Sequence, residues 1–285
     1  MTMTPESLVE STTELTSFPD VAFRINDLLT DENSDISDIG EVVETDPALT
    51  SALLRLSNSA LYNLGSKVST IDRAIAVVGM REVRSLAFGI SATTTFKNIP
   101  FHLISVENFW KHSLYCAAAA QATVRIGRIR TAESMFTAGL LHDIGQPVLF
   151  SQQPELSKEA LELSLYQNDG LTPHVSEREV FGFDHCAVGA ALARKWNFPQ
   201  ALIDCIAYHN MPYSDGPASE ANHVLIVHIA NSLAVLTELD SLDLESAPPI
   251  DPRALDDLDL SADLIPEIVG ETEQSVEGLL QLFVN

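Results

Sequence analysis

The chain has 285 residues, of which 46% are hydrophobic, a composition typical of globular proteins and too apolar for a disordered one. No uninterrupted apolar run approaches the roughly 18 residues needed to cross a bilayer, and the N-terminus lacks the basic start and apolar block of a secretory signal. The lack of such a run predicts a protein that does not contact a membrane. Three widely spaced cysteines, Cys116, Cys186 and Cys205, argue against a disulfide framework and predict a cytoplasmic protein.

The net charge of -24 is concentrated at the two ends of the chain. Residues 1–46 carry 12 acidic residues against Arg24 alone, and residues 238–277 carry 13 against Arg253 alone, whereas residues 47–237 are nearly neutral. A surface of this sign repels phosphate backbones and argues against direct nucleic-acid binding. The favoured interpretation of the acidic ends is a solvated surface, and the alternative is a docking surface for a basic partner.

Apolar residues recur at helical spacing along most of the chain, and no segment alternates convincingly like a strand. In chain order, the pattern predicts helices from Pro47 past Leu56, from Ser69 or Thr70 to Gly79, through Val83–Ile90, over Val106–Ile126, over Ala132–His142 with an end at Gly145 and Pro147, from Asp184 through Trp196, from Pro199 to His209, and over 221–237. Residues 151–176 are expected to form a short helix plus loop. The predicted fold class is therefore all-α.

The helix–glycine–helix segment around Gly79 also admits a helix-turn-helix interpretation. Arg81 and Arg84 would have to carry the DNA contacts, but they stand almost alone in an acidic chain. A packed helical hairpin is therefore the favoured interpretation.

The last part of the chain is expected to be an acidic linker and a helical extension, residues 241–285, with the proline-rich segment 246–252 as its linker. It ends in an apolar group, Leu279, Leu280, Leu282 and Phe283. Leaving this group in water costs about 25 cal/mol per Å² of apolar area. We therefore expect residues 238–285 to pack back on the rest of the chain.

The sharpest local motif is GLLHDIG at residues 139–145. An adjacent histidine and aspartate, here His142 and Asp143, can both ligate one cation through imidazole nitrogen and carboxylate oxygen. Three further histidines, His112, His185 and His209, fall on other predicted helices beside apolar positions. If all five residues met inside a helical bundle they would form a metal site. The alternative for each is a hydrogen-bonded core residue.

Cys205 and His209 lie four residues apart, a spacing that would place a soft-metal pair on one helical face. A buried free thiol is the favoured interpretation of Cys205, because cysteine is among the most buried residue types. The remaining histidines, His102, His174, His223 and His228, show no partner pattern and receive no role.

Several segments together resemble the HDOD family, the HD-related output domains of bacterial signalling proteins. They are Phe18-Pro19, DPALTSALLRLSNSALY (46–62), STIDRAIAVVGMREVRSL (69–86), FWKHS (109–113), AGLLHDIGQPVL (138–149), EREVFGFDHCAVGAALARKWNFP (177–199) and AYHNMP (207–212). The resemblance implies an HDOD domain over residues 15–240. It also implies a multi-helix bundle like that of the HD phosphohydrolases, with an N-terminal helical subdomain.

The resemblance also implies a metal-ligand set. His112 matches the first histidine of the catalytic HD relatives, and His142 and Asp143 match their His-Asp pair. The positions of His185 and His209 match the further histidines of dinuclear forms.

Two positions depart from that set. Asn210 stands where relatives often have a second adjacent histidine, and Asn231 where they have a closing aspartate. An amide is neutral and binds a dication more weakly than a carboxylate does, so both departures weaken the site.

Three hypotheses follow from the resemblance and its departures. The first is a bacterial signal-transduction output or scaffold module without catalysis, with a degenerate metal site and a signalling protein as its partner. The second is a metal-dependent phosphohydrolase acting on a nucleotide or cyclic dinucleotide, which needs well-bound metal. The third is a purely structural interaction protein. The resemblance accordingly allows one or two divalent metal ions, from Mn, Mg, Fe, Ni or Zn, or none.

Overall fold

A computed structural model describes residues 3–12, 18–58, 66–96, 103–131, 135–166, 172–214 and 221–283. Within these residues the chain is helical and contains no strand, as the sequence predicts. The helices are α1 (Pro5–Ser11), α2 (Asp20–Thr30), α3 (Ile36–Glu44), α4 (Pro47–Ser57), α5 (Ile71–Val78), α6 (Met80–Phe96), α7 (Val106–Ile126), α8 (Met135–Leu141), α9 (Gly145–Gln152), α10 (Pro154–Tyr166), α11 (Pro173–Phe181), α12 (His185–Lys195), α13 (Gln200–Tyr208), α14 (Asn222–Glu238), α15 (Pro252–Asp257) and α16 (Ile265–Phe283). None of them has an apolar stretch long enough to cross a bilayer.

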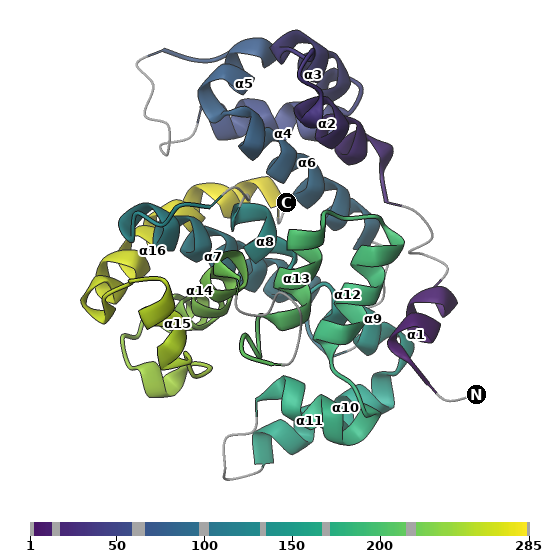
Figure 1. Ribbon diagram of the computed structural model, residues 1–285. Helices are drawn as coiled ribbons and strands as arrows, with labels where there is room; N and C mark the ends of the chain where they lie inside the picture. The colour runs from purple at the N-terminus through teal and green to yellow at the C-terminus, as the bar shows by residue number, and fades with distance from the viewer. Residues whose placement is uncertain are drawn as a thin grey trace.

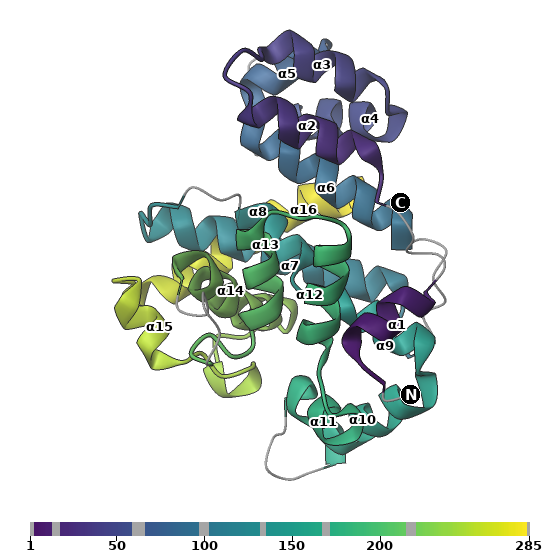
Figure 2. The same ribbon diagram turned by 45° about the vertical axis from the view of Figure 1, so that its right-hand side comes forward.

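Helices α2 to α5 form a small lobe at one end of the molecule, and α6 runs from this lobe to the main bundle (Figure 1). Apolar residues at helical spacing form a stripe along one face of each helix, and these faces pack against one another in the lobe. In α4, for example, Leu49, Ala52 and Leu53 are all fully buried. The lobe matches the expected N-terminal helical subdomain. Helix α1 is not part of it, because it lies on α12 and α9 at the far side of the bundle (Figure 2).

Aromatic rings join the lobe to the bundle at Phe18, just before α2. The Phe18 ring centroid lies 4.8 Å from that of Trp196, 5.0 Å from that of Phe198 and 5.7 Å from that of Phe88. These partners come from α6 and from the end of α12, so one buried ring connects three parts of the chain. Such aromatic contacts add about 0.5–1.5 kcal/mol each beyond the area they bury.

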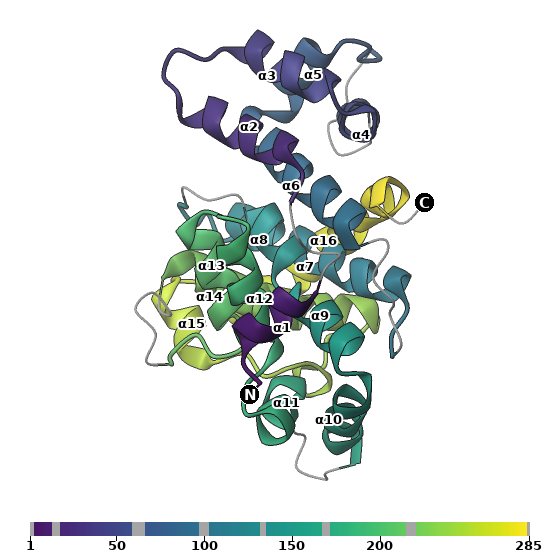
Figure 3. The same cartoon turned by 90° about the vertical axis from the view of Figure 1, so that its right-hand side faces the viewer.

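The main bundle is built around α7, which packs against α8, α14 and α16 (Figure 3). Small residues allow the closest of these approaches. A Cβ atom on Gly139 of α8 would lie 2.7 Å from the Ala117 Cα atom of α7. The alanine-rich stretch from Ala117 to Ala120 is buried, as helices at short separation require. The predicted bounds of this helix, Val106–Ile126, are confirmed.

Several predicted helix boundaries are confirmed by capping. Asp46 accepts hydrogen bonds from the amides of Ala48 and Leu49, and Pro47 occupies the first turn of α4. Asp184 likewise accepts from the amide of Ala187 at the start of α12. Gly79 ends α5 at a φ of 95°, a conformation that glycine adopts without steric cost.

Two predicted boundaries are wrong. The prediction ended a helix at Gly145 and Pro147, whereas these residues begin α9; the preceding helix α8 ends at Leu141, and residues 142–144 form a turn. A proline is tolerated in the first turn of a helix because its missing N–H has no partner there anyway. The segment 151–176 contains two helices, α10 and the start of α11, where one was predicted.

The C-terminal segment packs on the bundle, as predicted; of the apolar group at its end, Leu280 packs against the core, and the side chains of Leu279, Leu282 and Phe283 lie outside the described part of the chain. Helix α16 lies along α7 and α14 and also reaches α4, with Ile268 and Val276 buried. The segment is attached before α16 as well. The Tyr213 hydroxyl donates to Asp257 at 2.7 Å, and the Asp251 amide donates to His228 Nε2 at 2.9 Å.

Candidate metal centre

His142 and Asp143 lie in the turn between α8 and α9, inside the main bundle. Their exposed fractions are 0% and 6%. The His142 Nδ1 atom donates to the Gly139 carbonyl at 2.7 Å, and its Nε2 atom lies 3.2 Å from Asp143 Oδ2. Because α8 ends at Leu141, His142 and Asp143 lie in a turn and not on the helix, and this turn directs both side chains into the bundle.

The other three histidines meet this pair from different helices. His112 comes from the second turn of α7, His185 from the first residue of α12, and His209 from the C-cap of α13. The His142 ring centroid lies 5.4 Å from that of His112 and 4.8 Å from that of His209, and the His185 and His209 centroids are 5.7 Å apart. The five candidate ligands predicted from the sequence therefore lie together.

Asp143 is the centre of this group. Its Oδ1 atom lies 3.3 Å from His185 Nε2 and 3.1 Å from His209 Nε2. Its Oδ2 atom faces His142 and also accepts a hydrogen bond from Gln146 at 3.2 Å. One buried carboxylate thus contacts three imidazoles.

The four imidazoles share one orientation, with Nδ1 bound to an acceptor and Nε2 directed inward. The Nδ1 partners are the Gly139 carbonyl for His142, Glu177 for His185 at 2.6 Å, the Ile206 carbonyl for His209 at 3.1 Å, and Glu238 for His112 at 2.9 Å. From these partners we assign the proton to Nδ1 in each ring. When a metal is bound, this proton on Nδ1 leaves the lone pair of each Nε2 atom for the metal, whereas without a metal a second proton can occupy Nε2.

This arrangement fits a cation at the centre. A neutral imidazole Nε2 and a carboxylate oxygen both present lone pairs, so their contacts near 3 Å need a proton or a cation between them. The buried atoms His142 Nε2 and Asp143 Oδ1 have no hydrogen-bond partner among the described residues. Unpaired buried polar atoms of this kind are costly unless a ligand satisfies them. The residues present therefore suit a divalent metal.

At the centre, interactions between charged groups shift the pKa values of the side chains further than burial shifts them in the opposite direction. Burial alone lowers the pKa of His142, but the Asp143 carboxylate raises it well above its ordinary value. Burial alone raises the pKa of Asp143, but His142 and His185 hold it well below its ordinary value. For Cys186 burial raises the pKa, yet the neighbouring His185 and His209 lower it to about 7. The carboxylate is therefore ionised and the thiol is close to ionisation.

The two asparagines at which the resemblance predicts weaker ligands both face the centre. The Asn231 Oδ1 atom on α14 lies 3.1 Å from His112 Nε2. The Asn210 Nδ2 atom, directly after His209, lies 3.0 Å from His185 Nε2 and 2.9 Å from His209 Nε2. Each amide thus contacts an inward-facing imidazole nitrogen, where a charged or imidazole ligand is expected in the catalytic relatives.

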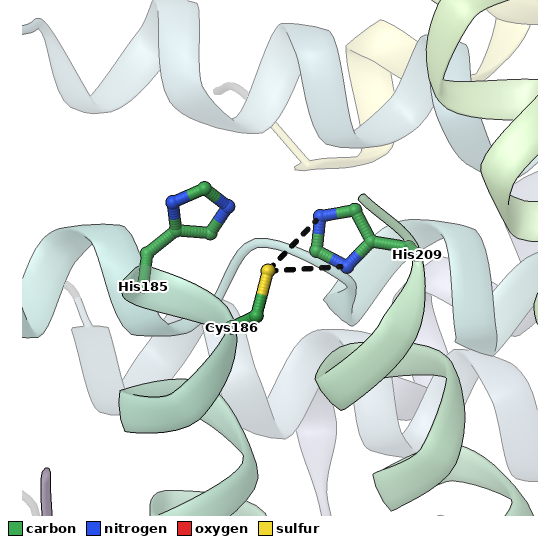
Figure 4. A group of neighbouring side chains, drawn as sticks. All are labelled: His185, Cys186 and His209. Carbon is green, nitrogen blue, oxygen red and sulfur yellow. Dashed lines mark hydrogen bonds between the residues drawn. The ribbon is translucent and has the colours of Figure 1, made fainter. Parts of the chain in front are cut away.

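The thiol beside His209 belongs to Cys186, a residue to which the sequence analysis gave no role. Its Sγ atom lies 3.8 Å and 3.9 Å from the two ring nitrogens of His209 (Figure 4). Cys205, the cysteine at helical spacing from His209, instead lines a small separate cavity with Phe88 and Leu202. Residues four apart share a helix face, but His209 is the C-cap of α13, and its ring faces the neighbouring helix α12.

Other contributing residues were also missed. Glu177 and Glu238 hold His185 and His112 by Nδ1, and His228 Nδ1 donates to the His209 carbonyl at 2.7 Å. No periodicity could have found Glu238, because it lies 126 residues after its partner. His174 lies in the cavity described next. His102 lies outside the described residues, and His223 Nε2 lies 4.0 Å from an Asp204 carboxylate oxygen.

A cavity of about 270 Å³ opens onto the centre. It reaches Asp143, His185 and both asparagines, and no lysine or arginine occurs among its described lining residues. They are Ile104, Asn108, Phe109, His112, Asp143, Gln146, Thr172, Pro173, His174, His185, Asn210, Asn231, Val235 and Pro248.

Solved structures share this fold. A protein of unknown function from Geobacter sulfurreducens with an HDOD domain aligns with a TM-score of 0.72 at 24% identity, covering 95% of this chain and 96% of that one. A candidate phosphohydrolase from Shewanella amazonensis SB2B aligns with a TM-score of 0.73 at 22% identity, covering 97% and 98%. A candidate signal transduction protein from Marinobacter aquaeolei VT8 aligns with a TM-score of 0.75 at 23% identity, covering 97% and 61%.

Sequence comparison agrees with these structures. An uncharacterized protein of Treponema pallidum (strain Nichols) is 26% identical over 210 residues, which are 73% of this chain and 40% of that protein. The chain therefore spans less than half the length of this curated relative. The family model of the HDOD domain matches residues 15–212, more than half of the chain. The resemblance inferred from the motifs is thereby confirmed, and the chain belongs to the HDOD domain family.

Proposed function

We propose that this chain is a signal-transduction output module whose HD-type centre holds one divalent metal ion on His112, His142 and Asp143 and hydrolyses phosphoesters slowly or not at all. The observation that carries the metal is the common orientation of the histidines, with Nδ1 bound and Nε2 directed inward. The three ligands offer donor atoms that all lie within 4.8 Å of one another.

The supporting residues suit a metal site as well. The Glu238 carboxylate bound to His112 Nδ1 orients that ring and increases the basicity of its Nε2 atom. The Gly139 carbonyl does the same for His142. Asn231 adds a neutral oxygen at 3.1 Å from His112 Nε2, so Asp143 is the only carboxylate among the proposed ligands.

The same geometry argues against fast hydrolysis. A bound dication would supply Lewis acidity and lower the pKa of the water that it holds. Its retention depends on a complete ligand set, and Asn231, which the resemblance places where catalytic relatives have an aspartate, offers only a neutral amide oxygen at 3.1 Å from His112 Nε2. The described cavity lining also offers no lysine or arginine to hold the phosphate of a substrate. Because the fold does not depend on the metal ligands, the helical bundle remains available for contacts with a signalling partner whether or not a metal is bound.

One observation favours the second candidate function, a metal-dependent phosphohydrolase. The cavity of about 270 Å³ leads directly to Asp143 and His185, so a small ligand can reach the centre. This is close to the lower end of the volumes that ligand sites have, roughly 300–1,000 Å³. A small phosphoester is therefore the substrate class to test.

The deciding experiment loads the purified chain with Mn²⁺ or Mg²⁺, measures bound metal by mass spectrometry, and offers cyclic dinucleotides, nucleoside phosphates and an aryl phosphodiester. We expect one bound ion per chain and turnover no faster than that of the Asp143→Ala variant. His142→Ala should lose the ion, whereas the control His223→Ala should keep it, since His223 lies outside the centre. Robust turnover that disappears in His142→Ala would overturn the non-catalytic role and establish the phosphohydrolase. A wild-type chain that binds no metal would overturn the metal centre.

A further inference from the structure

A second chamber adjoins the cavity at the proposed metal centre. This inner chamber measures about 110 Å³, whereas the outer cavity, which reaches Asp143 and His185, measures about 270 Å³. The two share Ile104, Gln146 and Pro173 in their walls, so a ligand that lies at the centre can extend past these residues into the inner chamber. Together the two spaces exceed the lower end of the volumes that ligand sites have, roughly 300 Å³.

The inner chamber lies between α9 and the hairpin formed by α10 and α11, at the end of the molecule opposite the small lobe (Figure 1). Its lining residues Ser157, Ala160 and Leu161 share one face of α10, and Glu177 and Phe181 share one face of α11, because residues three and four apart are neighbours on a helix. Each helix of the hairpin therefore turns one face toward the chamber.

The polar groups of the inner chamber are poorly placed to hold water. Gln146 already donates to Asp143 at 3.2 Å, and Glu177 already accepts from His185 at 2.6 Å. The Ser157 hydroxyl oxygen is buried and has no hydrogen-bond partner among the described residues. A buried water typically makes about two to four hydrogen bonds to polar groups that would otherwise be unsatisfied. The chamber therefore favours an apolar occupant.

The other walls of the inner chamber are apolar, and they include the side chains of Phe150, Phe181, Ala160 and Leu161. An unfilled cavity destabilises a folded protein in proportion to its volume, so an occupant that enters from the outer cavity would remove this cost. A dry apolar cavity of about 150 Å³ accepts benzene. The inner chamber is somewhat smaller but adjoins the outer cavity, so it suits one six-membered ring and not two.

Charge determines which end of a ligand enters the inner chamber. No lysine or arginine occurs among its described lining residues, and the charged residue among them is Glu177. Its carboxylate repels an anionic group, whereas a metal ion bound beside Asp143 would attract one. A ligand with an anionic head and an apolar ring therefore lies with its head at the centre and its ring in the chamber.

We propose that the inner chamber is a specificity pocket for one aromatic or similarly sized apolar ring, carried by a ligand whose phosphate-type or carboxylate head lies at the metal centre. The inference rests on the proposed function, because the head needs the proposed ion. Gln146 and Glu177 line the chamber and also bond to Asp143 and His185, so an occupant lies against the residues that position the centre. The module therefore selects aryl-bearing anions over small anions without a ring.

The experiment measures ligand binding to the full-length chain loaded with Mn²⁺ by isothermal titration calorimetry. The probes are ethylphosphonate, benzylphosphonate and 2-phenylethylphosphonate, which contain no phosphoester bond, so that slow hydrolysis does not disturb the measurement. We expect at least one ring-bearing probe to bind about tenfold tighter than ethylphosphonate or better, because its ring leaves water. Equal affinities for all three probes would overturn the inference.

Two comparisons locate the ring in the inner chamber. Ala160→Leu adds three carbons at a buried lining position and should reduce the gain from the ring to less than twofold, with the affinity for ethylphosphonate unchanged. The matched control Glu159→Leu makes a similar addition at an exposed position of the same helix and should keep the gain. A folded Ala160→Leu variant that still prefers the ring would overturn the inference.

The second comparison uses the wild type alone and covers the case in which Ala160→Leu fails to fold. A probe with two rings, 4-phenylbenzylphosphonate, exceeds the inner chamber and should lose the gain, whereas an open apolar surface would bind it more tightly still. Tighter binding of this probe would therefore contradict the proposal.

Bound metal, counted by mass spectrometry, separates this inference from the proposed function. A chain that holds one ion but does not prefer the ring-bearing probes would overturn only the specificity pocket. A chain that holds no ion yet prefers them would overturn only the metal centre.

Discussion

At the scale of single residues, Glu177 holds His185 at two points. One carboxylate oxygen accepts from the His185 backbone amide at 2.8 Å and from its ring Nδ1 at 2.6 Å. The amide is one of the unpaired donors at the start of α12, and the ring contact sets the orientation of Nε2. The exposed fraction of Glu177 is only 5%, so both bonds lie out of water.

Replacing Glu177 by glutamine is expected to lower the free energy of unfolding by about 1–3 kcal/mol, because hydrogen bonds to charged groups contribute about 1.5–3 kcal/mol. The control is Glu179→Gln, a change on the same helix at an exposed position. Its effect should stay within about 0.5 kcal/mol. Urea denaturation of both variants tests the prediction, and equal effects would show that the buried pair is not stabilising.

His174 predicts a pH dependence. Its burial, with the positive charge of His185 as a smaller cause, lowers its pKa to about 4. Between about pH 6.5 and pH 4 the unfolded chain therefore binds a proton that the folded chain does not, so stability falls as the pH is lowered. His174→Gln removes this contribution. We expect wild type and variant to differ by the same amount at pH 7 and 8, and the wild type to lose roughly 1–2 kcal/mol more on acidification to pH 4.5. Parallel pH profiles of the urea midpoint would contradict this expectation.

At the scale of helices, the position of the centre depends on how closely α9 approaches α12. A Cβ atom on Gly145 would lie 1.9 Å from the His185 carbonyl oxygen and 2.5 Å from the Gly189 amide nitrogen. Both are backbone atoms, which cannot move aside as the end of a flexible side chain can. The sequence predicts a helix end at Gly145, yet Gly145 begins α9. The close contact with α12 explains why a glycine is found at this helix start.

Gly145→Ala should therefore separate α9 from α12 and destabilise the fold by about 3 kcal/mol or more, at the upper end of overpacking effects. Gly270→Ala is the matched control within α16, because a Cβ atom there meets no atom within 4 Å. Alanine is favoured over glycine in helices by up to about 1 kcal/mol, so this variant should be as stable as the wild type or more so. Thermal and urea unfolding of the two variants measure the difference; a tolerated Gly145→Ala would mean that the two helices are not held this close.

At the scale of the whole molecule, α16 links parts of the chain that are far apart in sequence. It lies along α7 and α14 and contacts α4 of the small lobe (Figure 3). An ion pair between Arg125 and Glu271 also joins it to α7. The ion pair is largely exposed on the arginine side, so its contribution is small. Burial of apolar residues therefore holds the helix in place.

Ile268→Ala tests this packing in the full-length chain. The side chain is fully buried, so its loss should cost about 2–5 kcal/mol. Glu267→Ala, an adjacent exposed position, should change the stability by less than about 0.5 kcal/mol. Similar, small effects in both variants would show that α16 is not part of the cooperative unit.

The sequence alone was sufficient for the helical class, most helix positions and the family. Helix periodicity and capping are local, so Val106–Ile126 and the caps at Asp46 and Asp184 could be read from neighbouring residues. The candidate ligands were also identified by motif, while their role in binding metal stays a prediction. Boundaries failed at Gly145, where a contact with α12 decides the conformation.

Only the tertiary structure decided which groups meet. The rotation and crossing of α7, α12, α13 and α14 bring His112 to Glu238 and place Cys186, not Cys205, beside His209. The same packing puts the Asn210 amide within 3.3 Å of three donor atoms. A repeat of 3.6 residues specifies which side of a helix is buried, but it carries no information about which side chain of another helix will face it.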